Sequence, residues 1–399
     1  MSKKSIIIYI LILFLIIALI FTGLYFLSDK NSSKNVNTSP EEITKEVLLP
    51  DSKVHFIAAG DNLIHNNIYE QAAARSSNGG YNFDFAYKNV ENIIRNSDIA
   101  FINQETILAS SIYEPSSYPT FNTPIQMGDK LISLGFNVIN HSNNHVLDKG
   151  TKGAFACLDY WSDKPVLVTG LYRNEQDMDN IKVIEKNGIT FSFIGITEHT
   201  NGLNIPKNSE LKLIYTKDET TIEKLIKKAK TISDVVVVCP HWGEENSNDV
   251  LESQISLAEK MTFWGADIII GTHPHVLQKI ETVTAENGNK SIVYYSLGNF
   301  ISAQNKGNNL IGGIADFNVI KNNNTGEITI ENVKLIPVIT HYTGSYNNIQ
   351  IYPYYLYNDN LSKNHGVRKK TRDFSMEYID KILNKYIGEE YLEKYITKE

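Results

Sequence analysis

Short apolar runs recur along the chain, and most of them end in a loop that is rich in polar side chains. Each run is dominated by Val, Ile, Phe and Ala, which is typical of strands buried on both faces of a sheet. The runs with their loops read VHFIAAGDNLIH, IAFINQET, FNVINHSNNH, VVVVCPHWGEE, ADIIIGTHPH and IVYYSLGNF. This pattern predicts buried strands with helices covering the sheet.

Segments with helical spacing lie between these strands. Examples are AYKNVENIIRN, TIEKLIKKAKTI and LESQISLAEKMTFWG, the last of which closes on Gly265, a common helix stop. Two hairpins interrupt the alternation, with Asn-Gly in IKVIEKNGITFSFIGIT and Thr-Gly in IADFNVIKNNNTGEITIENVKLIPV. The alternation of strands and helices predicts an α/β fold, and the hairpins predict that its sheets are mixed.

The start of the chain has a different pattern. Residues 5–27 contain no charged side chain, and about 20 apolar residues suffice to span a bilayer as a helix. Lys3 and Lys4 precede this run, and positive charge stays on the cytoplasmic side. We therefore expect a single-pass cell-membrane protein with a cytoplasmic stub (residues 1–4), one transmembrane helix (5–27) and its main domain outside the cytoplasm. The alternative is a cleaved signal peptide, although the run exceeds the usual core of about 7–15 residues and lacks a small-x-small cleavage site.

The rest of the chain divides by composition. Residues 28–51 are rich in Ser and Asn and are expected to form a polar linker. The main domain is predicted to span residues 52–340, and residues 341–399 are expected to form a C-terminal arm and helices. The net charge of −7 is mild and the lysines are scattered, so no basic stripe indicates nucleic acid binding. Cys157 and Cys239 are interpreted as plain core thiols rather than as a disulfide framework.

Candidate functional residues follow directly after the apolar strands. In open α/β sheets, ligands gather at this position because the loops there present side chains into one crevice. Five of the ten histidines in the chain occur there, together with carboxylates and amides. The candidate metal ligands are Asp61, His65, Glu105, Asn144, His241, His273 and His275.

This set of residue types indicates a catalytic metal centre. Imidazoles with carboxylates suit Mn, Fe or Zn, whereas a structural zinc site would be rich in thiols. One catalytic ion needs three or four protein ligands, so about seven candidates predict two divalent ions, which can clamp both oxygens of a phosphoryl transfer. Asp61 and Glu105 are the candidates for a bridging carboxylate. The alternative for His273 and His275 is a loop that is merely polar.

His145 is a candidate for a different role. It follows Asn144, and consecutive side chains diverge, so His145 can stand over a substrate as a general acid. Asp148 either accepts a hydrogen bond from the other ring nitrogen of His145 or caps a helix.

The ordered blocks GD, NQE, NNHVLDKG, HWGEE, GTHPHVLQ and YSLGNF resemble the CapA family of bacterial capsule, or poly-gamma-glutamate, synthesis proteins over about residues 54–338. This resemblance implies a four-layer α/β/β/α sandwich like that of calcineurin-like metallophosphoesterases, with two metal ions at the strand ends. Matching blocks assign ligand roles to Asp61, Glu105, Asn144, His241, His273 and His275, and the acid role to His145. Residues expected to support the ligands or shape their loops are Asn103, Trp242, Glu244 and Asn299; for Asn299, a simple chain turn is an equal alternative.

Two positions depart from the wider superfamily. Three residues separate Asp61 from His65, where that superfamily has one, which leaves His65 open as a ligand. Glu105 stands where an aspartate is usual, which leaves the geometry of the bridge open.

The resemblance also implies a process. It predicts a membrane-anchored extracytoplasmic protein of capsule biosynthesis or export, whose dinuclear metal site hydrolyses a phosphoester or a related bond. A glutamate polymer contains amide bonds and no phosphate, however, and fold similarity does not decide activity. The alternative is a non-catalytic, metal-dependent component that binds the polymer or assembles a membrane synthase complex. Expected partners are the membrane, capsule synthase membrane subunits and an anionic polymer.

Overall fold

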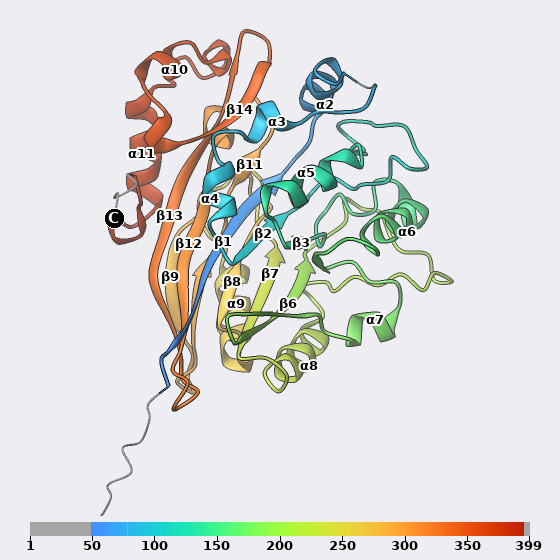
Figure 1. Cartoon of the computed structure of the whole chain (residues 1–399), viewed down its shortest axis with the longest axis vertical. Helices are drawn as coiled ribbons and strands as arrows, with labels where there is room; N and C mark the ends of the chain where they lie inside the picture. Colours follow the sequence, from blue (N-terminus) through green and yellow to red (C-terminus); the bar gives the residue numbers. More distant parts are fainter. Residues whose placement is uncertain (1–48, 78, 395–399) are drawn as a thin grey trace, which may run out of the picture. The chain divides into compact units, whose positions relative to one another are not determined.

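Two mixed sheets form the framework of the protein, as Figure 1 shows. The computed structural model describes residues 49–77 and 79–394. The eight-stranded sheet has the order β14-β13-β12-β1-β2-β3-β4, with β11 also paired to β1, and the six-stranded sheet has the order β5-β6-β7-β8-β10-β9. The predicted α/β fold with mixed sheets is confirmed.

The strands of the eight-stranded sheet are β1 (Ser52–Asn62), β2 (Ile99–Asn103), β3 (Val138–Asn140), β4 (Leu167–Thr169), β11 (Asn299–Ile301), β12 (Ile311–Lys321), β13 (Ile328–Thr343) and β14 (Asn347–Pro353). Those of the six-stranded sheet are β5 (Val183–Lys186), β6 (Ile189–Thr197), β7 (Val235–His241), β8 (Ile268–Ile270), β9 (Ile280–Thr284) and β10 (Lys290–Tyr294). The helices are α2 (Asn66–Ala74), α3 (Asp84–Tyr87), α4 (Glu91–Arg95), α5 (Gln126–Leu134), α6 (Gly150–Trp161), α7 (Glu175–Asp179), α8 (Glu219–Ala229), α9 (Glu252–Trp264), α10 (Asp359–Lys363) and α11 (Met376–Tyr386).

The two sheets pack face to face, and strand β6 shows why. Successive side chains of a strand point to opposite faces. Phe191 and Phe193 belong to the core shared with the eight-stranded sheet, where Phe56 of β1 stacks on Phe193 at 6.2 Å between ring centroids. Ile194 and Ile196 belong to a separate core that includes side chains of α8 and α9. The continuous apolar runs therefore arise because each face of these strands is covered.

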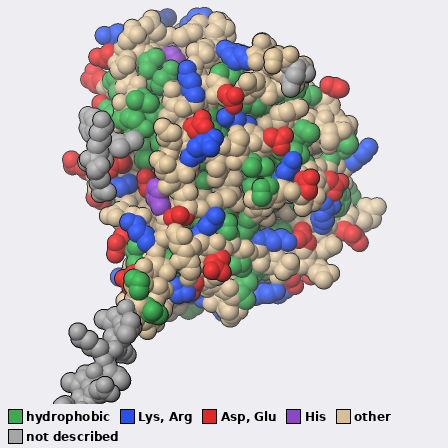
Figure 2. Space-filling model, in the orientation of Figure 1, with side chains coloured by type: hydrophobic (Ala, Val, Ile, Leu, Met, Phe, Trp, Pro, Cys, Tyr) green, Lys and Arg blue, Asp and Glu red, His purple; other side chains and the backbone are tan. Residues whose placement is uncertain are grey.

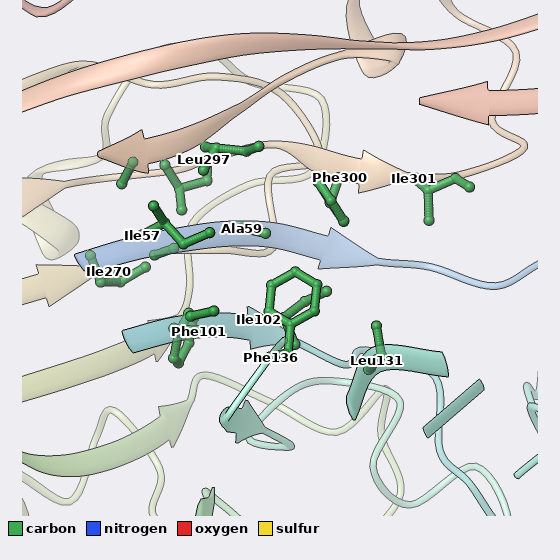
Figure 3. Close-up of a cluster of buried hydrophobic side chains, with 14 of the residues drawn as sticks. Ile57, Ala59, Phe101, Ile102, Leu131, Phe136, Ile270, Leu297, Phe300 and Ile301 are labelled. Carbon is green, nitrogen blue, oxygen red and sulfur yellow. The ribbon is translucent and has the colours of Figure 1, made fainter. Parts of the chain in front are cut away.

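The first core continues on both sides of β1. Figure 3 shows Ile57 and Ala59 of β1 close to Ile102 of β2, with Leu131 of α5 and Phe136, which follows α5, nearby. All five side chains are fully or almost fully buried. This packing holds β1 and β2 rigidly, so that the residues at their carboxyl ends are held in fixed positions.

Most predicted turns and helix ends are confirmed. The β5–β6 hairpin turns at Asn187 and Gly188, both with positive φ (50° and 78°), as an Asn-Gly turn requires. Gly265 ends α9 in the left-handed conformation with φ 115°. The helical pattern in residues 86–96 forms two short helices, α3 and α4, rather than one continuous helix.

The expected stub (1–4), transmembrane helix (5–27) and residues 28–48 of the linker lie outside the described residues. Among the residues that the structure describes, no helix is long and apolar enough to cross a membrane. The expected limit between residues 340 and 341 falls inside β13, and β14 continues the same sheet. Cys157 and Cys239 are buried free thiols, as predicted.

Candidate metal centre

Side chains from both sheets converge because the carboxyl ends of their parallel strands meet at one edge. β1, β2 and β3 run parallel in one sheet, and β7, β8 and β10 run parallel in the other. Asp61 pairs with Asn103 and with Asn299 in strand register, and His241 is the last residue of β7. Residues almost 240 positions apart in the chain therefore lie side by side at this edge.

Asp61, Glu105 and His275 form the first group of potential ligands. Their candidate ligand atoms all lie within 4.8 Å of one another, and all three side chains are buried. The Nδ1 atom of His275 lies 3.0 Å from Asp61 Oδ2 and 3.0 Å from Asn299 Oδ1. Because Nδ1 is engaged there, Nε2 is the ring nitrogen left to face Glu105, whose Oε1 is 3.7 Å away.

Glu105 is the most unusual group in the centre. Both of its carboxylate oxygens are buried without a hydrogen-bond partner. Burial holds the pKa of Glu105 well above its usual range, and the charge of Asp61 raises that pKa further, while His275 lowers it. An ionised buried carboxylate requires a compensating charge, and a cation bound at its two oxygens would provide one.

His241, His273 and Asn144 form a second group, which also approaches Glu105. Nε2 of His241 lies 3.0 Å from Asn144 Oδ1, 3.1 Å from His273 Nδ1 and 3.8 Å from Glu105 Oε1. The Asn144 oxygen and the two imidazole nitrogens are thus close enough to serve as ligands of one ion. Glu105 Oε1 thus lies within 3.8 Å of a ring nitrogen from each group, which makes Glu105 the described carboxylate best placed to bridge them.

The two groups differ in the charge of their imidazoles. Burial, followed by the neighbouring histidines, lowers the pKa of His241 and of His273 well below the usual range. Both are therefore neutral at pH 7, the form that binds metals. Burial also lowers the pKa of His275, but Glu105 and the hydrogen bond and charge of Asp61 outweigh it and raise that pKa to about 10.

The loop that follows β8 holds its two histidines in a rare backbone conformation. His273 has φ 101° and His275 has φ 60°, a region that non-glycine residues seldom occupy and that costs about 1–3 kcal/mol per residue. Gly271 lets the chain enter this loop, since a Cβ there would lie 2.0 Å from the Tyr295 carbonyl oxygen. Strain of this kind persists at functional sites, and here it directs both imidazoles into the centre.

Hydrogen bonds from neighbouring side chains orient the potential ligands. Asn103 donates to Asp61 Oδ1 at 2.8 Å. Thr272 Oγ1 lies 2.9 Å from Nδ1 of His241, which leaves Nε2 for the centre. Partners of this kind set the tautomer and direction of a metal-binding histidine. Asn103 and Asn299, two of the residues expected to support ligands or shape loops, thus contact Asp61 and His275.

His145 lies at hydrogen-bond distance from Asp148, the partner predicted for it. Its Nδ1 lies 2.8 Å from Asp148 Oδ2, and Asp148 also accepts the backbone N–H of Phe121 at 2.6 Å. The Phe121 ring packs edge-on against His145, with 4.8 Å between ring centroids. His145 is thus held in one orientation, with Nε2 free of a described protein partner.

Three further candidates lie differently from the ligand groups. His65 packs edge-on against Phe121, and its Nδ1 lies 3.1 Å from the Leu63 carbonyl oxygen and 3.2 Å from the Ala303 backbone nitrogen. Its pKa is lowered to about 4, first by burial. Trp242 donates to the Tyr295 carbonyl at 2.9 Å and belongs to the second core. Glu244 is exposed.

Several residues near the centre were not among the predicted site residues. Thr272 immediately precedes His273 in the same loop and could have been considered from that position. The charge of Glu245, rather than that of Glu244, raises the pKa of both Glu105 and His275. His199 and Asn201 follow strand β6; the His199 ring lies 5.1 Å from that of His273. Their strand, TFSFIGIT, ends in a polar loop and carries the same signal as the others.

The geometry defines the class: a two-sheet α/β sandwich whose parallel strand ends enclose a candidate metal centre. Residues 55–304 match the family model described as bacterial capsule synthesis protein PGA_cap. This match covers more than half of the chain, and the chain belongs to that family of capsule synthesis proteins, as its resemblance to CapA predicted.

Two curated relatives agree with this assignment. The chain is 32% identical over 235 residues to the capsule biosynthesis protein CapA of Bacillus anthracis, covering 56% of this chain and 55% of that protein. It is 31% identical over 201 residues to the PGA biosynthesis protein CapA of Bacillus subtilis (strain 168), covering 50% and 51%. The chain spans about half the length of the curated relatives it matches.

Solved structures show weaker likeness. A putative 5'-nucleotidase from Staphylococcus aureus aligns with a TM-score of 0.47 at 16% identity, covering 72% of this chain and 54% of that chain. The NAD nucleotidase of Haemophilus influenzae aligns with a TM-score of 0.46 at 13% identity, covering 84% and 60%. Likenesses at this level support no inference about activity.

Proposed function

We propose that this protein is a metal-dependent hydrolase of capsule synthesis that acts outside the cytoplasm on a phosphoester or a related bond. The observation that carries the proposal is Glu105, whose two buried oxygens lack hydrogen-bond partners although two groups of nitrogen and oxygen ligands lie close to it. Cations held by these groups would supply the partners that the carboxylate lacks. The calcineurin-like metallophosphoesterase fold, with four layers, is part of the same proposal.

The residues fit two divalent ions by their chemistry. One ion would be held by Asp61, Glu105 and His275, and the other by Glu105, Asn144, His241 and His273. Nitrogen and oxygen donors without a thiolate suit Mn, Fe or Zn. In the second set the two imidazoles are neutral and the amide oxygen is uncharged. Glu105 is therefore the only negative ligand with which this set would hold its cation.

The surrounding residues would then serve hydrolysis. Divalent cations supply Lewis acidity toward a phosphoryl group and activate water near neutral pH. The Nδ1–H group of His145 donates a hydrogen bond to Asp148, which directs a protonated Nε2 toward a leaving oxygen as general acid. Phe121 limits rotation of that imidazole and shields it from water on one side.

The place of action is inferred from the family and from the apolar segment at residues 5–27. The two curated relatives are described as proteins of capsule and PGA biosynthesis. We propose that residues 5–27 anchor this chain in the cell membrane, with the described domain outside the cytoplasm. Capsule synthase membrane subunits and an anionic polymer are its proposed partners. Protease accessibility of the described domain in intact cells tests this orientation.

The catalytic proposal is tested with the purified full chain, its His145→Gln and His241→Gln variants, and His55→Gln as a matched control. His55 pairs with Asp316 near the start of β1, away from the centre. Bound metal is measured by elemental analysis, and turnover with bis(p-nitrophenyl) phosphate. We expect His241→Gln to lose metal and turnover, His145→Gln to lose turnover alone, and His55→Gln to keep both. Turnover of the wild type no greater than that of His145→Gln refutes the catalytic role.

A second function is favoured by the family assignment itself, because the curated relatives are named for a capsule polymer and not for hydrolysis. In that case the centre binds carboxylates of an anionic chain without cleaving a bond. Binding of poly-glutamate that a chelator abolishes, with no turnover of any phosphoester, would establish this role in place of the first.

A further inference from the structure

We propose that Asn201, in the turn after β6, is a positioning residue that fixes the side-chain amide of Asn144 with its carbonyl oxygen toward the candidate metal centre. This inference rests on the proposed metal-binding function. It assigns a role to a residue outside the strand-end motifs that suggested the ligands.

The backbone places Asn201 beside the ends of two strands. Thr197, the last residue of β6, pairs with His241 in strand register, and the Glu198 backbone N–H donates to the His241 carbonyl at 2.9 Å. The turn that follows is therefore tied to the strand that carries a candidate ligand. Asn201 has φ 50°, a left-handed conformation that asparagine tolerates better than most residues.

The hydrogen-bond partners of Asn144 determine which end of its side-chain amide faces the candidate metal centre. Asn144 is only 1% exposed, its Oδ1 lies 3.0 Å from His241 Nε2, and its Nδ2 donates to Asn201 Oδ1 at 3.3 Å. The two ends of an amide have nearly the same shape, so the surrounding hydrogen bonds decide which end faces which way. An acceptor at the Nδ2 end therefore keeps the carbonyl oxygen directed at the centre.

Loss of this acceptor would leave a buried N–H group unsatisfied. A turned amide would then present Nδ2, which cannot bind a cation, to His241 and His273. Asn201 also lies 3.4 Å from His145 Nδ1, but that nitrogen carries one proton and already pairs with Asp148 at 2.8 Å. The role of Asn201 is thus toward Asn144 rather than toward His145.

Two substitutions at Asn201 distinguish the role of its side chain from the role of its backbone conformation. Asn201→Gly keeps the left-handed turn and removes the acceptor, whereas Asn201→Asp keeps an acceptor oxygen of nearly the same shape. Asn187→Gly is the matched control, because Asn187 also has φ 50° but lies in the β5–β6 hairpin at the opposite end of β6.

The readout is Mn²⁺ affinity of the full chain by isothermal titration calorimetry, with thermal unfolding measured beside it. Removing a partner that orients a ligand typically weakens metal binding by about 10–100-fold. We expect Asn201→Gly to weaken Mn²⁺ binding by about tenfold or more, and Asn201→Asp to bind at least as tightly as wild type. Asn187→Gly should keep wild-type affinity even where it lowers the melting temperature.

The outcomes distinguish this inference from the proposed function. Wild-type affinity in Asn201→Gly, or equally weak binding in Asn201→Asp, overturns the positioning role while the metal centre stands. A wild-type chain that binds no Mn²⁺ overturns the metal centre and the positioning role together.

Discussion

Replacing Glu105 by glutamine is expected to stabilise the cation-free protein and to abolish its stabilisation by divalent cations. A buried ionised carboxylate lowers the free energy of unfolding when no cation is bound. Glutamine has nearly the same shape and removes that charge. The substitution should raise stability without a cation and remove the stabilisation that a cation provides. It therefore tests both the cost of burying Glu105 and its proposed role in binding a cation.

The magnitude follows from three contributions. The candidate ligand atoms of Glu105 and Asp61 lie within 4.8 Å; at an effective dielectric of about 20, two unit charges at that distance repel by about 3.5 kcal/mol. Protonated His275, 3.7 Å away, attracts Glu105 by about 4.5 kcal/mol on the same scale. Dehydrating the ionised carboxylate costs about 3 kcal/mol more than dehydrating a neutral amide of the same shape. Glu105→Gln should therefore raise the free energy of unfolding by about 2 kcal/mol.

The assay is chemical denaturation of the full chain with chelator and with Mn²⁺. A cation at 100 times its dissociation constant stabilises the wild type by about 2.7 kcal/mol per site, and the variant should show no such gain. Glu105 binds its proton more tightly when folded, so its ionisation destabilises the protein above the unfolded pKa of about 4.3. The advantage of the variant in chelator should therefore shrink as the pH falls toward 5.

Glu244→Gln serves as the matched control, because Glu244 is exposed and the same charge is removed nearby. Its stability should match the wild type in chelator and in Mn²⁺. The reasoning fails if Glu105→Gln is less stable than wild type in chelator, or if Mn²⁺ stabilises the variant as strongly as the wild type.

Three further predictions concern the histidines and the loop after β8. His145→Gln should lower phosphodiester turnover by about 10²–10⁴-fold with unchanged Mn²⁺ content; loss of Mn²⁺ would instead make His145 a ligand. The pKa of His275, which the adjacent carboxylates raise to about 10 against the effect of burial, means that it is charged at pH 7 and must lose a proton to bind metal. Mn²⁺ affinity should therefore rise with pH, and titration calorimetry in Tris and HEPES should show proton release; an enthalpy equal in both buffers contradicts this. Gly271→Ala should lower the free energy of unfolding by at least about 2 kcal/mol and weaken Mn²⁺ binding, since the added Cβ would lie 2.0 Å from the Tyr295 carbonyl oxygen; wild-type values in denaturation and titration would show that the loop can shift.

Patterns within a few residues predicted much of the fold. Continuous apolar runs indicated strands covered on both faces, because only such strands exclude polar side chains from both sides. Asn187-Gly188 and Gly265 indicated a hairpin and a helix end, because their backbone conformations are local properties. The polar residues after those strands indicated a shared centre, because parallel strands end at one edge.

Contacts between distant segments decided the rest. The sequence alone could not show that Glu245 rather than Glu244 influences the centre, because side-chain direction depends on the tertiary path of the loop after β7. Thr272 and Asn201 acquire their partners only when β6, β7 and β8 pair in register. Helix signals in residues 86–96 did not reveal the break between α3 and α4. The sequence by itself thus determined which residue types stand at the strand ends, whereas the tertiary structure decided which of their atoms meet, because register and backbone strain depend on the whole fold.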